Sequence, residues 1–178
     1  MTVVLDVPSR IVAAIRDVPD FPKPGILFKD ITPVLLDPAL FRDATEALAA
    51  PFANHAISHV VAIESRGFIL GGPVAQALGA GFVPFRKPGK LPHVVERVEY
   101  ALEYGVDALE CHRDALSGGQ RVLVVDDVLA TGGTAGAACA LVESLGATVQ
   151  GCSFLVELAF LNGRAKLGGK RVERLVAY

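Results

Sequence analysis

The segment VLVVDDVLATGGT, residues 122–134, places the strongest limit on how this chain can fold. Its first four residues are all apolar, as in a parallel strand that is buried on both faces. Asp126 and Asp127 follow at the carboxyl end of that strand, and a loop rich in glycine and threonine comes next. A helix is predicted over 135–145, ending at Gly146. A buried strand that leads into a helix in this way indicates an α/β fold.

The same alternation of strands and helices covers most of the 178 residues. An N-terminal helix is predicted with Ser9 as its capping residue. Asp37 and Pro38 mark the start of another, because Asp caps a helix and Pro fits its first turn. Strands are predicted at 60–64, 82–85, 122–125, 149–156 and 172–176, with helices at 38–51, 68–78 and 135–145. This order predicts one α/β domain, residues 1–178, with a mainly parallel central sheet flanked by helices.

Two stretches interrupt the alternation. Residues 21–35 carry three prolines and a glycine around a short strand-like run. We expect the first 35 residues to form a small N-terminal hood over the edge of the sheet. Residues 87–104 begin with Pro88, Gly89 and Pro92 and then alternate from Val94. That pattern predicts a two-stranded hairpin within 94–104, projecting from the sheet as a flexible loop.

Composition and charge exclude several classes of function. The net charge of −2 gives no electrostatic support for nucleic-acid binding. No apolar run approaches the roughly 18 residues of a membrane span, and no signal peptide is recognisable, so we expect no membrane contact and a cytoplasmic location. The three cysteines are odd in number and widely spaced, which favours reduced thiols over a disulfide or zinc site. His55 and His59 precede a predicted strand, which argues against a metal site on a shared helix face.

The loop 130–134 opens a helix, and a helix N-terminus behind a glycine turn is a ready site for an anion. Asp126 and Asp127 lie beside it, where open α/β sheets place their ligands. Together these features suit a sugar phosphate, with the carboxylates facing hydroxyls or a metal ion. Each half has a plainer explanation, since two aspartates can form a solvated turn and two glycines a tight connection. No lysine follows the glycines and no GxGxxG is present, which excludes the ordinary nucleotide loops.

Cations follow two other predicted strands. Arg66 lies in ESRGF, where it can bind pyrophosphate through two parallel hydrogen bonds or simply pair with Asp126 or Asp127. The segment RKPGK, residues 86–90, adds three cations, including Lys87. They form either a solvated face or further contacts to the same polyanion.

At these residues the chain resembles the type I phosphoribosyltransferases, which bind phosphoribosyl pyrophosphate (PRPP). The segments FPKPGILFKDITPVL, ESRGF, RKPGKLP, LEYG and VVDDVLATGGT occur in the order and spacing of the adenine-specific branch of that family, spanning 21–134. The resemblance implies the type I phosphoribosyltransferase fold and transfer of the phosphoribosyl group from PRPP to adenine, giving AMP for purine salvage. It also implies Mg²⁺ held mainly through the substrate, with no protein metal site, and a homodimer.

The resemblance assigns roles to individual residues. Asp126 and Asp127 would hold the ribose hydroxyls, and Arg66 and Lys87 the pyrophosphate. In the hood, Leu27 and Lys29 would present backbone groups to adenine while Phe28 stacks on the base, or Phe28 is simply part of the core. Many members carry Arg at the position of Lys29, which argues against a fixed role for that side chain. The 5′-phosphate would be bound by Ala130, Thr131, Gly132, Gly133 and Thr134.

A catalytic acid or base is implied outside the phosphate loop. Ala130 stands where hypoxanthine–guanine phosphoribosyltransferases usually carry an aspartate that serves N7 of the base, and alanine cannot carry a proton. The resemblance therefore places proton transfer on Glu103, on a mobile loop with Tyr104 packed near it, and gives Arg66 the second catalytic role. Composition alone favours a plain exposed glutamate on a hairpin.

Two other functions stay open from the sequence. One is a phosphoribosyltransferase for another purine such as xanthine, because backbone readout of a base leaves no mark in the sequence. The other is a non-catalytic regulator that senses PRPP. Such regulators usually carry a DNA-binding domain and a basic face, and this chain is short and weakly acidic.

Overall fold

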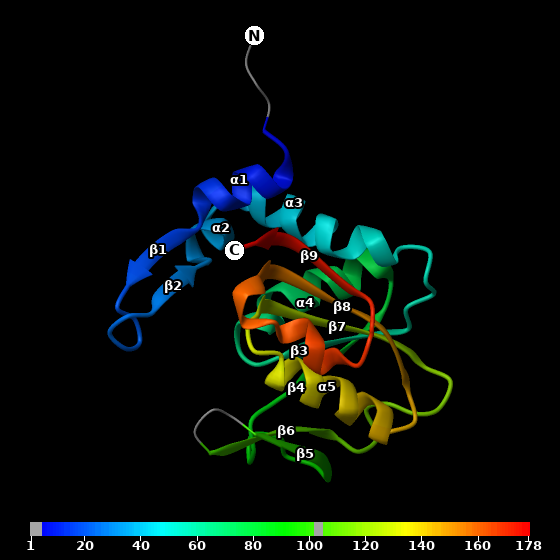
Figure 1. The fold of residues 1–178 in the computed structure, drawn as a ribbon. Coiled ribbons are helices and arrows are strands. Elements are labelled where there is room, and N and C mark those ends of the chain that lie inside the picture. The colour runs from blue at the N-terminus through cyan, green and yellow to red at the C-terminus, as the bar shows by residue number, and fades with distance from the viewer. Residues whose placement is uncertain (1–4, 102–104) are drawn as a thin grey trace.

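The structure is a computed structural model that describes residues 5–101 and 105–178. At its centre lies a five-stranded sheet in the order β4-β3-β7-β8-β9, and all of these strand pairs are parallel (Figure 1). The strands are β3 (His59–Ile63), β4 (Gly81–Phe85), β7 (Arg121–Leu129), β8 (Thr148–Glu157) and β9 (Val172–Ala177). The predicted mainly parallel α/β fold is confirmed.

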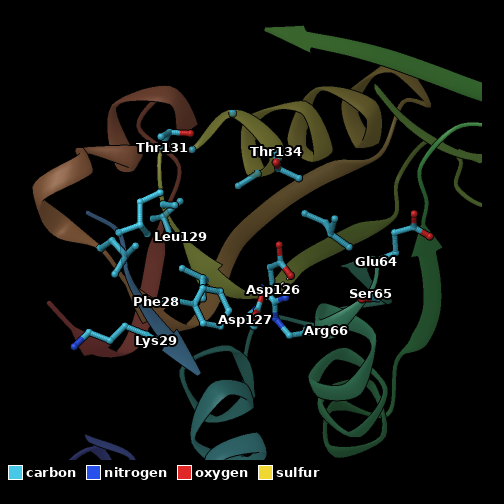
Figure 2. Close-up of a pocket in the computed structure, with 18 of the residues that line it drawn as sticks. Phe28, Lys29, Glu64, Ser65, Arg66, Asp126, Asp127, Leu129, Thr131 and Thr134 are labelled. Atoms are coloured by element: carbon cyan, nitrogen blue, oxygen red, sulfur yellow. Dashed lines mark hydrogen bonds and ion pairs between the residues drawn. The ribbon is translucent and has the colours of Figure 1, made fainter. Parts of the chain in front are cut away.

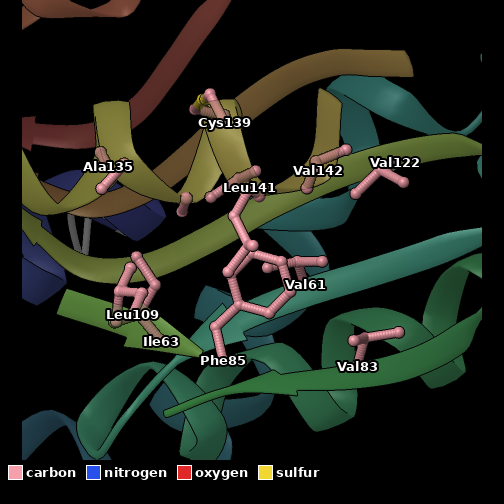
Figure 3. Packing of buried hydrophobic residues seen from close by; sticks show 14 of the residues in the cluster. Val61, Ile63, Val83, Phe85, Leu109, Val122, Ala135, Cys139, Leu141 and Val142 are labelled. Atoms are coloured by element: carbon pink, nitrogen blue, oxygen red, sulfur yellow. The ribbon is translucent and has the colours of Figure 1, made fainter. Parts of the chain in front are cut away.

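Helices cover both faces of the sheet, which is why its strands are apolar on both sides (Figure 1). On one face pack α1 (Val7–Ala14), α3 (Pro38–Ala49) and α4 (Arg66–Leu78), and on the other α5 (Gly133–Ser144). Figure 3 shows Val61 and Phe85 of the sheet facing Leu141 of α5. Val60 is buried with the opposite cluster. This alternation fixes which side of each strand faces which helix layer.

Most predicted helix ends are confirmed. The Asp37 side chain accepts hydrogen bonds from the backbone N–H groups of Ala39 and Leu40 at 2.9 and 3.0 Å, and α3 starts at Pro38. The prediction that Ser9 caps the first helix was wrong. Asp6 is the cap, and its carboxylate accepts from the Ser9 backbone N–H at 2.9 Å. Short helical segments complete the chain at α2 (Thr32–Leu36), η1 (Ala50–Phe52), η2 (Ala159–Leu161) and η3 (Gly163–Leu167).

The hood contains an antiparallel hairpin, formed by β1 (Arg16–Pro19) and β2 (Leu27–Asp30). The sequence predicted the second of these strands within 21–35. It missed β1, because a four-residue strand with three exposed positions has no periodic pattern. The hairpin stands beside the sheet near the ends of β7 and β8 (Figure 1).

The second hairpin differs from its prediction. Its strands are β5 (Val95–Ala101) and β6 (Val106–His112), so the second strand follows residue 104 and does not lie within 94–104. Nor does the hairpin simply project, because Leu109 and Cys111 are fully buried in the core below α5. The four consecutive buried residues of β6 removed the alternation on which the prediction depended.

The aspartate pair also sits differently from its prediction. β7 continues to Leu129, so Asp126 and Asp127 lie within the strand and not after it. Val128 pairs with Val156 of β8 and resumes the ladder beyond the two carboxylates. The three cysteines are buried free thiols, as predicted. No helix in 5–101 or 105–178 has the length and apolar character needed to cross a membrane.

Candidate active site

A cavity of about 480 Å³ opens where the hood meets the ends of β3 and β7 (Figure 2). Its volume lies in the range of small-molecule binding sites. The structure brings every described candidate residue to this cavity. Glu103 and Tyr104 lie outside the described residues. The candidates that line it are Leu27, Phe28, Lys29, Arg66, Lys87, Asp126, Asp127, Ala130, Thr131, Gly132, Gly133 and Thr134.

The two aspartates have different surroundings. The Asp127 side chain is buried and its carboxylate pairs with Nε of Arg66. Asp126 packs against Gly67 of α4, where an added Cβ would stand 2.6 Å from the Asp126 carboxylate. Burial, together with the charge of Asp127, raises the pKa of Asp126 well above its usual range. The site therefore holds one aspartate as the ion-paired carboxylate and the other as the more readily protonated group.

Replacing Asp126 by asparagine is expected to stabilise the folded protein near neutral pH. A carboxyl whose pKa is raised on folding contributes its stability at low pH and loses it as the pH rises through the folded pKa. The stability gain of Asp126→Asn should therefore be largest at pH 7–8 and should shrink toward pH 4. Urea unfolding at both pH values measures it, and a gain independent of pH would contradict the assignment.

Arg66 adopts the pairing that the sequence left as its alternative. Its guanidinium pairs with Asp127 and lies 5.8 Å from the centre of the Phe28 ring. Arg66 begins α4 and lines the cavity between the hood and the aspartates (Figure 2). The pair uses Nε of Arg66, and nearly half of the Arg66 side chain is exposed, so an incoming polyanion can still reach the guanidinium.

The phosphate loop, residues 130–134, leads directly into α5. Gly132 has φ +77°, and a Cβ there would overlap the carbonyl oxygen of Gly163. A Cβ on Gly163 would in turn overlap the carbonyl oxygen of Ala130. The two glycines allow the loop and η3 to touch backbone to backbone. This leaves N–H groups at the start of α5 facing the cavity, as an anion requires.

An ion-pair cluster behind the loop fixes η3. Arg164 donates two hydrogen bonds to Glu157, at 2.6 and 2.8 Å, and Arg174 pairs with the same carboxylate at 2.6 Å. The Glu157 side chain is buried, and its bonds to Arg164 hold its pKa below the usual value. Sequence reasoning missed this support. In the sequence around Arg164, only the Asn162-Gly163 dipeptide, which is typical of a turn, pointed to a structured loop here.

Glu64 separates the three cations of RKPGK into two groups. Its buried carboxylate accepts from Nε of Arg86 at 3.0 Å, from the Lys87 backbone N–H at 3.0 Å and from Nζ of Lys90 at 2.7 Å. Burial favours the neutral acid, but these bonds outweigh it and lower the Glu64 pKa. Arg86 and Lys90 are thus paired with Glu64, whereas the Lys87 side chain is free of this cluster and lines the cavity.

The hood presents an aromatic ring and backbone to the cavity. Phe28 is half-buried, and its ring packs edge-on against Phe21 with centroids 5.1 Å apart. The Lys29 side chain points away from the cavity (Figure 2), toward Asp17 at 2.6 Å and the ring of Tyr178 at 4.0 Å. Lys29 can therefore contact a bound base only through its main-chain atoms.

Comparison with known proteins identifies the class first. The family model of the phosphoribosyl transferase domain matches residues 34–170, which include four of the five strands of the central sheet and the phosphate loop. The chain thus belongs to the type I phosphoribosyltransferases, and within them to the adenine phosphoribosyltransferase family. The adenine phosphoribosyltransferase of Methylococcus capsulatus is 57% identical over 170 residues, which are 96% of this chain and 99% of the relative.

Solved structures agree with this placement. The adenine phosphoribosyltransferase of Rhodothermus marinus superposes with a TM-score of 0.92 at 54% identity, covering 97% of this chain and 98% of its own. The Saccharomyces cerevisiae enzyme, solved with adenine and an imino-altritol bisphosphate, gives a TM-score of 0.90 at 42% identity, covering 95% and 98%.

Proposed function

We propose that this chain transfers the 5-phosphoribosyl group of PRPP to adenine, giving AMP and pyrophosphate in purine salvage. The observation that carries the proposal is a cavity lined together by the hood's aromatic ring, the phosphate loop and the aspartate pair. Adenine as the base is supported by the 57–58% identity to adenine phosphoribosyltransferases over nearly the full length of the chain.

The loop 130–134 is the proposed site of the 5′-phosphate. Backbone N–H groups at the start of α5, among them that of Thr134, and the hydroxyl of Thr131 donate charge-assisted hydrogen bonds to it. Asp126 and Asp127 accept from the ribose hydroxyls. Their charge also favours the positive character that develops at C1 of the ribose as pyrophosphate leaves. Arg66 and Lys87 bind the pyrophosphate.

Magnesium is proposed to enter with PRPP. Among the described residues, no cluster of three or more His, Cys, Asp or Glu side chains could hold a metal ion by itself. The carboxylates of Asp126 and Asp127 are oxygen donors of the kind Mg²⁺ prefers, so they fit an ion that is held mainly by substrate oxygens. When bound, Mg²⁺ offsets the negative charge that accumulates on the leaving pyrophosphate.

The base is proposed to stack on Phe28 while backbone groups of Leu27 and Lys29 read its edge. Adenine presents a donor at N6 and an acceptor at N1, and a 6-oxopurine presents the reverse, so the wrong base leaves buried groups unpaired. Glu103 is the proposed partner of N7, sharing a proton with the base as N9 attacks C1. Tyr104 is assigned to the same loop.

The aspartate pair gives a direct test of the PRPP site. The double variant Asp126→Asn, Asp127→Asn is expected to raise the KM for PRPP by about 10- to 100-fold, because it removes charged acceptors for the ribose hydroxyls. Steady-state kinetics with varied PRPP measures the change. Asp43→Asn is the control, since Asp43 pairs with Arg10 on the N-terminal helix. An unchanged PRPP dependence in the double variant would refute the assignment.

Product formation from PRPP and Mg²⁺ with adenine, hypoxanthine, guanine or xanthine, in separate reactions, tests the function itself. AMP from adenine alone is the expected result. Turnover only with a 6-oxopurine would keep the PRPP site and overturn the role of the hood. Saturable PRPP binding without turnover of any base would favour a PRPP-sensing regulator.

The remaining assignments are also proposals. We expect residues 1–178 to act as one domain with a hood at about 1–35. A homodimer stays a prediction from the family resemblance, and a cytoplasmic location stays a prediction from the sequence. Sedimentation velocity tests the first, and a single species of one chain mass would contradict it.

A further inference from the structure

The hydroxyl of Tyr100 joins three elements that surround the cavity. It accepts a hydrogen bond from Nζ of Lys87 at 2.7 Å and one from Oγ1 of Thr134 at 3.3 Å, and it donates to the Asp107 carboxylate at 3.1 Å. Lys87 follows β4, Thr134 lies in the first turn of α5, and Tyr100 and Asp107 are paired across the β5–β6 hairpin. A phenol has one hydrogen to donate and two lone pairs to accept, so this arrangement uses all of its hydrogen-bonding capacity.

Two of these partners belong to the cavity and two support them. Lys87 and Thr134 line the cavity, whereas Tyr100 and Asp107 are not among its described lining residues. The Tyr100 ring is itself held in place, because it packs against the core cluster below α5 and lies close to Gly133 of the phosphate loop. The Tyr100 hydroxyl is therefore held in place, and both the Lys87 ammonium and the Thr134 hydroxyl are hydrogen-bonded to it.

The Lys87 ammonium gains most from a fixed partner. A lysine side chain has four rotatable carbons, and ordering it on a ligand costs entropy unless it is already held. Here Nζ contacts the Tyr100 hydroxyl, lies 5.3 Å from the centre of the Tyr100 ring and pairs with Asp107. Burial lowers the pKa of Lys87, but the bonds to Asp107 and Tyr100 outweigh it, so the pKa is raised and the charge is kept.

We propose that Tyr100 is a positioning residue for PRPP: its hydroxyl sets the Lys87 ammonium and the Thr134 side chain in fixed relative positions, so that one ligand can meet both the ammonium and the backbone N–H of Thr134. The inference rests on the proposed function, in which Lys87 binds the pyrophosphate and Thr134 the 5′-phosphate. Tyr100 itself acts through these two groups. The hood lies on another side of the cavity, so adenine binding does not depend on Tyr100.

Tyr100→Phe is the variant that tests this role, because it removes the hydroxyl and keeps the ring that packs on the core. The KM for PRPP should rise about tenfold, the scale of one hydrogen bond to a charged group. The KM for adenine and the thermal unfolding midpoint should stay as in the wild type. Glu99→Gln is the matched control, because Glu99 is the preceding residue of β5 and faces solvent on the other side of the strand.

A double-mutant cycle separates positioning from a general structural effect. If Tyr100 acts through Lys87, Tyr100→Phe should raise the KM for PRPP clearly less in a Lys87→Ala background than in the wild type. Titration calorimetry of PRPP with Mg²⁺, on all four proteins, gives the same comparison without turnover.

Several results would overturn the inference. These are a KM for PRPP within twofold of the wild type, fully additive effects in the cycle, or an equal rise in both KM values with a lower unfolding midpoint. Failure of the proposed function looks different: the wild type would turn over no base, while calorimetry would still show whether Tyr100→Phe weakens PRPP binding. Absence of PRPP binding to the wild type would overturn both.

Discussion

Gly163→Ala is expected to lower kcat/KM for PRPP by about a hundredfold, although Gly163 lies behind the phosphate loop. An added Cβ would overlap the carbonyl oxygen of Ala130 and stand 3.0 Å from the backbone nitrogen of Gly132. Because both atoms belong to the backbone, no side chain can rotate away, and the loop must shift by about 1 Å. Displacements of that size in a positioning element cost on the order of 10²-fold in rate.

The same substitution should also destabilise the fold. Overpacking a tight contact costs roughly 1–3 kcal/mol, and Glu157 and Arg164 hold η3 in place so that it cannot retreat. Gly72→Ala is the matched control, because a Cβ on Gly72 of α4 would meet nothing within 4 Å. PRPP kinetics and urea unfolding measure both effects. Wild-type kinetics in Gly163→Ala would show that η3 does not set the geometry of the loop.

Glu103→Ala is expected to lower kcat by about 10²–10⁴-fold, the usual contribution of general acid–base catalysis. This corresponds to roughly 2.7–5.5 kcal/mol in the activation barrier. The expectation follows from the family resemblance and from Ala130, which leaves the phosphate loop without a group that can exchange a proton with the base. The measurement is kcat for AMP formation at saturating PRPP and adenine.

Glu103→Gln separates proton transfer from simple contact. Glutamine keeps the size and hydrogen-bonding reach of the side chain but cannot exchange a proton, so it should lose nearly as much activity as alanine. The KM for PRPP should change little in either variant. A loss of kcat below tenfold in Glu103→Ala would remove this residue from the mechanism.

Local sequence patterns predicted the frame of the fold well. The apolar run before Asp126 marked a strand buried on both faces, and the Asp37-Pro38 pair marked the start of α3. Gly146 follows the end of α5 with φ +81°, as its position after an apolar helix predicted. In each case the signal and the structure that it predicts lie within a few residues of each other, so short-range physics is sufficient.

The errors occur where a distant partner decides the local structure. β6 contains four consecutive buried residues because α5 covers the face of Leu109 and Cys111, while Glu110 on the other face accepts a hydrogen bond from the backbone N–H of Gly89, and this removes the alternation that marks a hairpin strand. β7 continues past its two aspartates because β8 offers backbone partners as far as Glu157. Asp6 replaces Ser9 as the first cap because the helix begins three residues earlier than its apolar pattern suggested.

The sequence by itself determined the α/β class, the phosphate loop and the set of candidate side chains, because each depends on residue types within one short segment. Only the tertiary structure decided how these side chains are used. It paired Arg66 with Asp127, bound Arg86 and Lys90 to Glu64, and left Lys87 at the cavity beside Tyr100. The attraction between two charges depends on their distance in space and not on their separation in the sequence. The partner of each cation is therefore decided only when strands and loops that are distant in the sequence come together.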